Sequence, residues 1–546
     1  MKRIQLNIYL TSFLLALGFV SCTDLEIEET DSFISDGFQG LENPSSSLDA
    51  LYSNIRGQLS DQANTYALVE VTTDAQLIPT RGADWGDNGR WRKLHQHEWG
   101  LEDSDVITPF EQWNSNQLLA SQILDDRSNS PEDIKLQARF LRAYAMWRIL
   151  DLYGQVPFRD TSLPSTELPE VYSGAEAVDF IISDLDICIS GLPVIGANTG
   201  DELKAPGKAA AKYLKAKILL NKHIYLNQLN GGSGTAESAD MAAVISLVDD
   251  ITADGFALQN GYFDIFKSSA DSETIWFTES NVSNVIYAPL HLNSFGLAGG
   301  GGWNGFSTLA EYYDLFEGDA DNNRVDTDLT RLDGQEERRG GVPPEGLEFT
   351  DRDLTEEAEG DGAGYEFGSN VGSGFLIGQQ YDLDGTKLKD RQGNDLEFSR
   401  DFVDGTGAKN LINNSERTGI RIIKYNPRFG LNRTHKIQFR YADAYLMKAE
   451  AMLRSSGDPT DMINTLRVLR DATPLGSVTE NDILDERARE LFTEGWRRND
   501  LIRFGQYLRG WEFKGDVEIG NEKRLLFPIP LPQILANPNL VQNPGY

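Results

Sequence analysis

The chain has 546 residues, of which 40% are hydrophobic and 25% charged, so it is long and apolar enough to bury a large core. A formal net charge of −34 excludes nucleic acid as the main partner, because nucleic-acid-binding proteins present basic surfaces, and it favours uncharged ligands. The only cysteines are Cys22 and Cys188. Because Cys22 is the predicted lipidation site described below, a disulfide framework is excluded, and Cys188 is predicted to be a buried, inert thiol.

The first 25 residues have the layout of a bacterial lipoprotein signal. Lys2 and Arg3 precede an apolar stretch that has the length of a signal peptide and not of a membrane span. Ser21 stands directly before Cys22, the arrangement that lipoprotein signal peptidases recognise. We therefore predict that residues 1–21 are removed, that Cys22 is lipidated, and that the mature chain of net charge −36 is tethered at the envelope surface. The alternative is an ordinary secretion signal with an incidental cysteine.

Three stretches predict long helices that are packed between other helices. Residues 130–154 carry a proline and acids at their start, Gly154 at their end, and two apolar faces. Residues 206–229 and 441–455 repeat this type with small alanines between larger apolar residues. Such Ala-rich pairs indicate tetratricopeptide-like (TPR-like) hairpins in an irregular array.

The central part of the chain has a different composition. Glycine-dense and acidic stretches with short alternating pieces, such as ETIWFT, predict long loops with some strand between about residues 231 and 435. Helical patterns resume over 459–472, 481–495 and 497–508, before an extended, proline-rich tail. Because loops on a rigid scaffold usually carry ligand contacts, the central part is the expected ligand-facing region.

The chain resembles the SusD/RagB family, surface lipoproteins of Bacteroidota that capture glycans for an outer-membrane transporter. The resemblance rests on segments that occur in family order: Cys22 with its signal, TRGADWGDNGRWRKLHQHEW (80–99), ARFLRAYAMWRILDLYGQVPF (138–158), PGKAAAKYLKAKILL (206–220), FRYADAYLMKAEAMLR (439–454), ILDERARELFTEGWRRNDLIRFG (483–505) and FPIPLPQILANPNLVQNPGY (527–546). It implies a mostly α fold of TPR-like hairpins, no catalytic activity, and a TonB-dependent transporter of the SusC type as partner.

The expected organisation combines these observations. It comprises a signal peptide (1–21), a lipidated tether (22–45), an N-terminal TPR-like scaffold (46–230), a loop-rich insert with short strands (231–435), and a C-terminal helical scaffold with an extended tail (436–546). The expected function is capture of a neutral oligo- or polysaccharide at the outer membrane and its delivery to the transporter. The alternatives are a surface glycoside hydrolase, which requires two carboxylates facing each other across a cleft, and a purely protein-binding TPR scaffold.

Two loop tryptophans are the candidate sugar platforms, because an aromatic ring stacks on the apolar face of a pyranose while nearby polar groups bind its hydroxyls. Trp85 lies in a glycine-punctuated stretch that also supplies Arg81, Asp84 and Asp87. Trp303 follows four consecutive glycines, which suits a displayed ring or an adaptable lid. For both tryptophans the alternative is local packing, and packing is the preferred prediction for Trp91 and Trp99.

Metal sites and catalytic carboxylates are not expected. Asp319, Asp321 and Asn323 resemble the start of a calcium loop, but Arg324 and Thr330 occupy positions where an EF-hand needs Gly and Glu, so structural calcium is only a secondary possibility. His95 and His97 lack further ligands at matching spacing and are predicted to be ordinary hydrogen-bonded histidines. The helix over 481–495 carries Glu486, Arg489, Glu490 and Glu494 at ion-pair spacings beside an apolar stripe, which predicts scaffold.

Overall fold

In the computed structural model, the structure describes residues 37–164, 166–266, 270–280, 282, 285, 287–294, 301–318, 374–380, 387–425 and 435–546. The helices are α2 (Pro44–Ser60), α3 (Asn64–Tyr66), α4 (Arg90–Gln96), α5 (Ser104–Leu124), α6 (Glu132–Tyr153), α7 (Gly174–Gly191), α8 (Lys208–Tyr225), α9 (Ser238–Ala253), α11 (Ala310–Tyr313), α13 (Tyr441–Arg454), α14 (Thr460–Leu469), α15 (Glu480–Leu491), α16 (Arg497–Arg503) and α17 (Leu531–Ala536). The strands are β1 (Gln155–Phe158), β2 (Glu170–Ser173), β3 (Thr274–Glu279), β4 (Gly374–Leu376), β5 (Gly378–Gln379), β6 (Glu397–Phe398), β7 (Arg421–Ile423) and β8 (His435–Arg440).

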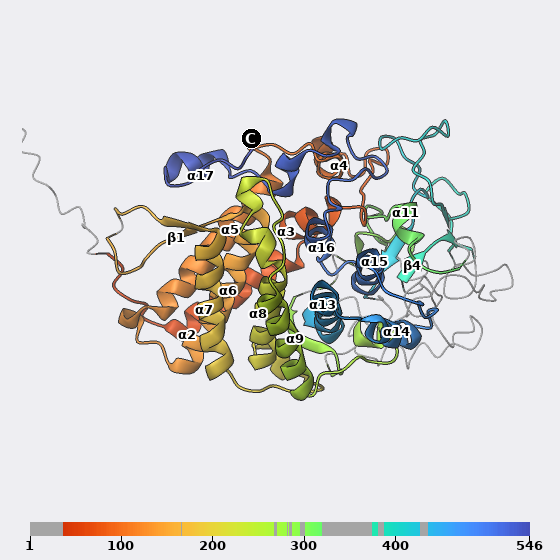
Figure 1. Ribbon diagram of the computed structural model, residues 1–546. Helices are drawn as coiled ribbons and strands as arrows, with labels where there is room; N and C mark the ends of the chain where they lie inside the picture. Colours follow the sequence, from red (N-terminus) through yellow and green to blue (C-terminus); the bar gives the residue numbers. More distant parts are fainter. Residues whose placement is uncertain are drawn as a thin grey trace, which may run out of the picture.

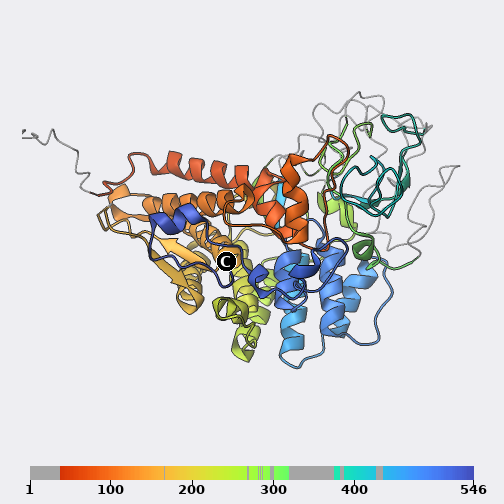
Figure 2. The same cartoon turned by 90° about the horizontal axis from the view of Figure 1, so that it is seen from above.

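The long helices form an array in which neighbours in sequence are neighbours in space. Helices α5 to α9 pack one against the next, and α13 continues the array on α9 (Figures 1 and 2). Their buried apolar side chains form one large core that extends from α2 to the tail. The predicted mostly α fold with short strands is confirmed. Within the described residues, no helix is both long and apolar enough to cross a membrane.

Helix α6 shows how the local sequence determines the ends of these helices. Gly154 adopts a left-handed conformation with φ of +74° and stops the helix, as predicted. Glu132 lies in the first turn, where the positive end of the helix dipole favours an acid. Pro131 is the N-cap residue and directly precedes the first helical residue, and the Ser130 hydroxyl donates to the Ile123 carbonyl (2.6 Å).

The central part of the chain contains more helix than its composition predicts. Residues 238–253 form α9, which packs on α8 and α13, so the helical scaffold continues beyond residue 230. The expectation of loops throughout 231–435 is therefore wrong for this stretch. The predicted strand ETIWFT is confirmed as β3, which pairs antiparallel with β8 and joins the central part to the C-terminal helices.

A smaller unit lies beside the C-terminal helices. It contains β4 paired with β7, β5 paired with β6, and α11 (Figure 1). Side chains of β4, β6, β7 and α11 share a second apolar core with Ala488 of α15. Residues 301–309 run between two other segments: Leu77 and Ser307 exchange two backbone hydrogen bonds (2.8 and 2.9 Å), and the Thr308 amide donates to the Ile420 carbonyl (2.9 Å). This threading brings the segment that contains Trp303 next to the segment that contains Trp85.

Candidate aromatic binding site

The glycines before Trp303 hold the chain close to a neighbouring segment. The amides of Gly302 and Trp303 donate to the carbonyls of His291 (2.8 Å) and Tyr287 (2.6 Å). A Cβ atom on Gly301 or Gly302 would collide with the backbone of residues 290–292, so only glycine permits this approach. The expectation that the glycines give Trp303 a freely adaptable loop is therefore wrong for these two positions; Gly299 and Gly300 lie outside the described residues.

Trp85 and Trp303, which are 218 residues apart, are in direct contact. The Trp85 indole nitrogen donates to the Trp303 carbonyl oxygen at 2.6 Å. Trp85 has a positive φ of 57°, and its ring meets Trp91 (5.5 Å) and Phe306 (5.7 Å) edge to face. The ring also covers Gly305, where a Cβ atom would clash with the indole. Trp85 is thus half-buried, part of the site and at the same time part of the local packing.

The exposed part of the site is a stacked pair of rings. Trp303 is 39% exposed, and its ring lies 5.6 Å from that of Tyr287 at an angle of 23°. We call Tyr287, Trp303 and Trp85 the aromatic platform. Sequence reasoning missed Tyr287, because it lies in an unremarkable apolar stretch, and only the backbone pairing of residues 287–291 with 302–306 reveals its position.

A charged cluster borders the platform. Arg391 forms ion pairs with both Asp84 and Glu416, and it is about half exposed. His291 contacts the other oxygen of Glu416 (3.1 Å); burial lowers the pKa of His291 to about 4, so the ring is neutral at physiological pH. Burial acts to raise the pKa of Glu416, but the hydrogen bonds from Arg391 outweigh it and the pKa lies below its ordinary value. The Glu416 carboxylate is therefore ionised and positioned.

The remaining predicted contacts divide between surface and interior. Asp87 is exposed and accepts a hydrogen bond from the Trp91 indole (2.7 Å), which leaves its other oxygen available. Arg81, in contrast, is only 2% exposed. Its five N–H groups donate to the Asn304, Ser415 and Thr418 carbonyls and to the Ser307 and Thr418 hydroxyls at 2.6–3.0 Å.

Because an arginine has five N–H donors, Arg81 has none left for a ligand. The expectation that Arg81 contacts a sugar is corrected: its side chain joins the Trp85 segment to the segments around Asn304 and Thr418. Its neighbour Arg421 makes similar bonds to Ser307 and Asn304. Arg81 thus supports the platform from the interior of the protein.

The other candidate residues have structural environments. Trp91 and Trp99 are 3% and 2% exposed, which confirms that they pack in the core. His95 and His97 are buried and bind backbone carbonyls at 2.9–3.1 Å, as expected of ordinary histidines. Cys188 is a buried free thiol, and burial raises its pKa to about 12, so it is inert as predicted.

Metal ligation has no support within the described ranges, where groups of three or more metal-ligating side chains are absent. Asp319, Asp321 and Asn323, like Cys22, lie outside those ranges. In α15, Glu486 binds Arg489 (2.7 Å), and Glu490 binds Arg440 and Arg470 (both 2.9 Å). These carboxylates are buried in ion pairs, which confirms the prediction that this helix is scaffold.

Comparisons with known proteins agree with the fold. The starch-binding protein SusD of Bacteroides thetaiotaomicron is 27% identical over 446 residues, which cover 76% of this chain and 72% of that protein. The surface glycan-binding protein A of Bacteroides uniformis superposes with a TM-score of 0.61 at 20% identity, covering 92% of this chain and 98% of that one. A laminarin-binding SusD-like protein gives a TM-score of 0.59 at 17% identity, with 93% and 100% covered. Because the SusD family model matches residues 272–546, half of the chain, the protein belongs to the SusD family.

Proposed function

We propose that this protein is a cell-surface lipoprotein that captures a glycan on the aromatic platform and passes it to a SusC-type transporter in the outer membrane. The proposed contacts are Trp303, Tyr287 and Trp85 for the sugar rings, with Asp84 and Asp87 for the hydroxyl groups. The capture itself involves no bond cleavage. The 27% identical relative named as starch-binding supports this class of ligand.

The exposed stack of Trp303 on Tyr287 is the observation that carries the proposal. Large rings are rarely left exposed without a function, and this ring is held in place by backbone bonds on both sides. The Trp85 indole, which donates to the Trp303 carbonyl, fixes the position of the exposed ring. The cluster of Asp84, Arg391 and Glu416 supplies polar groups at the edge, which is the combination that sugar recognition requires.

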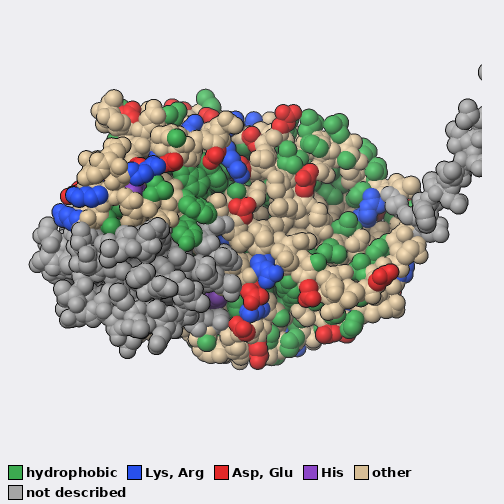
Figure 3. Space-filling view, turned by 180° about the vertical axis from the view of Figure 1, so that it is seen from behind, with side chains coloured by type: hydrophobic (Ala, Val, Ile, Leu, Met, Phe, Trp, Pro, Cys, Tyr) green, Lys and Arg blue, Asp and Glu red, His purple; other side chains and the backbone are tan. Residues whose placement is uncertain are grey.

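A neutral glycan fits this site better than a polyanion. The charged cluster that borders the platform has two acids, Asp84 and Glu416, and one cation, Arg391, and on the face shown in Figure 3 lysines and arginines are scattered among acids. An open surface with few stacking rings gives weak binding, so we expect micromolar or higher dissociation constants. Titration calorimetry with neutral glucans, mannans, xylans and fructans, repeated at low and high salt, tests this. Tight binding of a sulfated galactan that weakens sharply as salt is raised would contradict the proposal.

A surface hydrolase is the second candidate, and the platform gives it little support. A glycosidase needs one carboxyl group that is protonated near neutral pH. Glu416 is held as a carboxylate by Arg391, and Asp84 binds the same guanidinium. Incubation with the glycan that binds best should release no reducing sugar; release that tracks the purified protein would favour the hydrolase.

The two tryptophans should differ when each is replaced by alanine. Trp303→Ala should weaken glycan affinity severalfold and leave the unfolding midpoint nearly unchanged, because stacking contributes about 1 kcal/mol and the ring is exposed. Trp85→Ala should weaken binding and also lower the midpoint, because its ring packs on Phe306 and Trp91. Calorimetry and chemical unfolding on the same samples separate the two effects. A lower midpoint with unaltered affinity for Trp303→Ala would show that its ring serves packing.

Anchoring should depend on Cys22. Since no other lipid attachment point is proposed, Cys22→Ala should release the protein from washed outer membranes into the soluble fraction. The measurement is immunodetection in both fractions, made in cells that lack the transporter, because the transporter alone would retain the body of the protein. The matched control is Cys188→Ala, which should stay in the membrane fraction. Retention of Cys22→Ala in those cells would refute the lipoprotein assignment.

A further inference from the structure

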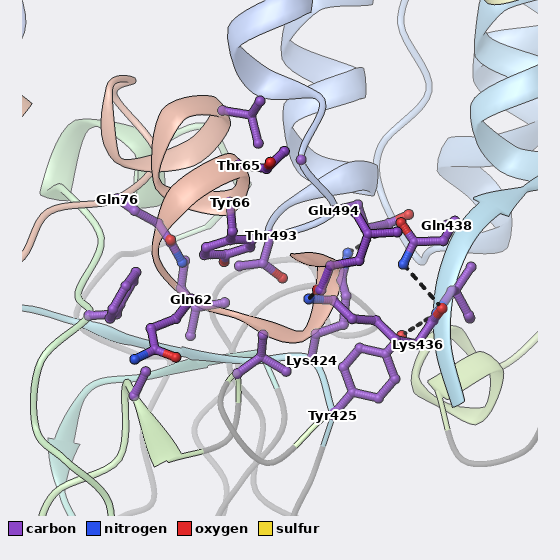
Figure 4. A pocket seen from close by; sticks show the side chains of 18 of the residues that line it. Gln62, Thr65, Tyr66, Gln76, Lys424, Tyr425, Lys436, Gln438, Thr493 and Glu494 are labelled. Carbon is purple, nitrogen blue, oxygen red and sulfur yellow. Dashed lines mark hydrogen bonds and ion pairs between the residues drawn. The ribbon is translucent and has the colours of Figure 1, made fainter. Parts of the chain in front are cut away.

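A pocket lies behind the aromatic platform. Phe306 separates the two: its ring meets Trp85 (5.7 Å) on one side and Tyr66 (6.1 Å) on the pocket side. Residues from α2, α3, α6, β8 and the end of β7 form the walls (Figure 4). The pocket has room of about 60 Å³, several times the roughly 10–15 Å³ that a single water needs. It is therefore large enough for a group of several atoms.

The pocket is positively charged, although the chain as a whole is strongly negative. Of its lining cations, Lys424 is paired with Glu494 at 2.7 Å. Lys436 donates to the Leu59 carbonyl oxygen, and Arg148 donates to the Tyr144 hydroxyl (2.9 Å). Among the residues that the structure describes, neither Lys436 nor Arg148 has a carboxylate at ion-pair distance.

Two cationic side chains without a carboxylate at ion-pair distance thus line one small space. Burial lowers the pKa of Lys436 to about 8, and Asp61 and Glu70, which lie beyond ion-pair distance, offset this effect only in part. The net charge of the chain is −34, so a positive pocket is a local exception that attracts anions against the overall field. An anionic group between Lys436 and Arg148 would compensate both charges.

Two glutamine side chains with unpaired amide oxygens line the opposite side of the pocket. Gln76 is only 5% exposed, and its Oε1, like that of Gln62, has no hydrogen-bond partner within the described part of the chain. Figure 4 shows both amides near Tyr66, across the pocket from Lys424 and Lys436. A buried polar group without a partner costs free energy, which a ligand hydroxyl or a water would recover. The amides therefore fit hydroxyl groups, while the cations fit an anion.

We propose that this pocket binds a hydroxylated carboxylic acid. The carboxylate lies between Lys436 and Arg148, and hydroxyl groups of the same molecule donate to the amides of Gln62 and Gln76. The apolar faces of Tyr66 and Phe306 cover the carbon skeleton. Two sources share this chemistry: the uronic acid unit of a glycan and a small α-hydroxy acid. The site is separate from the platform and does not depend on neutral-glycan binding there.

The test is titration calorimetry of the purified mature chain with sodium D-glucuronate, D-glucose and sodium lactate. Glucose has the same ring as glucuronate without the carboxylate, so we expect saturable binding of glucuronate and none of glucose at the same concentration. Lactate identifies the source: binding as tight as that of glucuronate indicates a small hydroxy acid, and much weaker binding indicates a sugar acid. Failure of both acids to bind would overturn the proposal.

Variants assign the binding to this pocket. Lys436→Met should weaken glucuronate binding at least tenfold. Lys389→Met removes the same charge from an exposed lysine that pairs with Asp395, and it should bind like the parent chain. Gln62→Met, which removes an amide and no charge, should weaken binding severalfold, and circular dichroism verifies that each variant is folded. Unchanged affinity in Lys436→Met, or equal loss in Lys389→Met, would overturn the site. Trp303→Ala should leave glucuronate binding unaffected, which separates this result from that for the platform.

Discussion

Replacement of Asp443 by asparagine should lower the free energy of unfolding by about 3–5 kcal/mol, the cost of removing one partner from a buried ion pair. Asp443 lies in α13 and is fully buried. It accepts from Lys217 of α8 and from Arg487 of α15, each at 2.7 Å, and from the Tyr213 hydroxyl. An asparagine retains the size of the side chain but leaves both cations without their shared charge. Chemical unfolding followed by circular dichroism measures the change.

The control is Asp249→Asn, which removes the same charge from an exposed position. Asp249 in α9 pairs with Lys448 of α13, and its side chain is 55% exposed. An exposed pair contributes about 1 kcal/mol or less, so the variant should unfold close to the parent chain. If both variants lose the same stability, the effect would stem from net charge. If neither does, the ion pairs between α8, α13 and α15 are not what fixes these helices together.

The helical scaffold was predictable because its signals are local. Gly154 and the acids near residue 132 mark the ends of α6, and the buried faces follow from the spacing of its apolar residues. Helix α9 was missed, since it follows a glycine-rich stretch that suggested loops throughout the central part. Its apolar positions Met241, Val244, Val248 and Ile251 keep helical spacing and are all buried. That pattern was present in the sequence and was outweighed by composition.

Two of the three platform residues, Trp85 and Trp303, were predictable from the sequence, but their assembly was not. A tryptophan among glycines is a local feature of the sequence, and both Trp85 and Trp303 have it. Their contact depends on the pairing of Leu77 with Ser307, which are far apart in sequence, and on the pairing of residues 287–291 with 302–306 across a short intervening segment. The sequence around Tyr287 does not indicate a ligand contact, because the position of this residue beside Trp303 follows only from the folded backbone pairing. Local composition was also misleading for Arg81, whose neighbours are glycines and acids although its side chain points into the interior.

Arg81→Lys should weaken glycan binding at least tenfold without removing any atom that touches the sugar. The guanidinium joins the Trp85 segment to residues 304–307 and 415–418 through five hydrogen bonds, which end on Asn304, Ser307, Ser415 and Thr418. Burial lowers its pKa to about 9, so it is still charged at pH 7. A lysine keeps that charge but has at most three donors, so at least two of the five hydrogen bonds are lost, at about 1.5–3 kcal/mol each for bonds from a charged group.

Hydrogen exchange distinguishes this positioning role from a direct contact. In Arg81→Lys, the amides of residues 302–308, which bond to Leu77, Ile420 and residues 287–291, should exchange faster than in the parent chain. In Trp303→Ala, which removes a ring and none of these backbone bonds, their exchange should stay the same although glycan affinity falls. Arg391→Lys is the matched control, since that arginine is half exposed and borders the platform. Parental exchange together with weakened binding in Arg81→Lys would mean that the arginine reaches the sugar after all, in a conformation other than the buried one seen here.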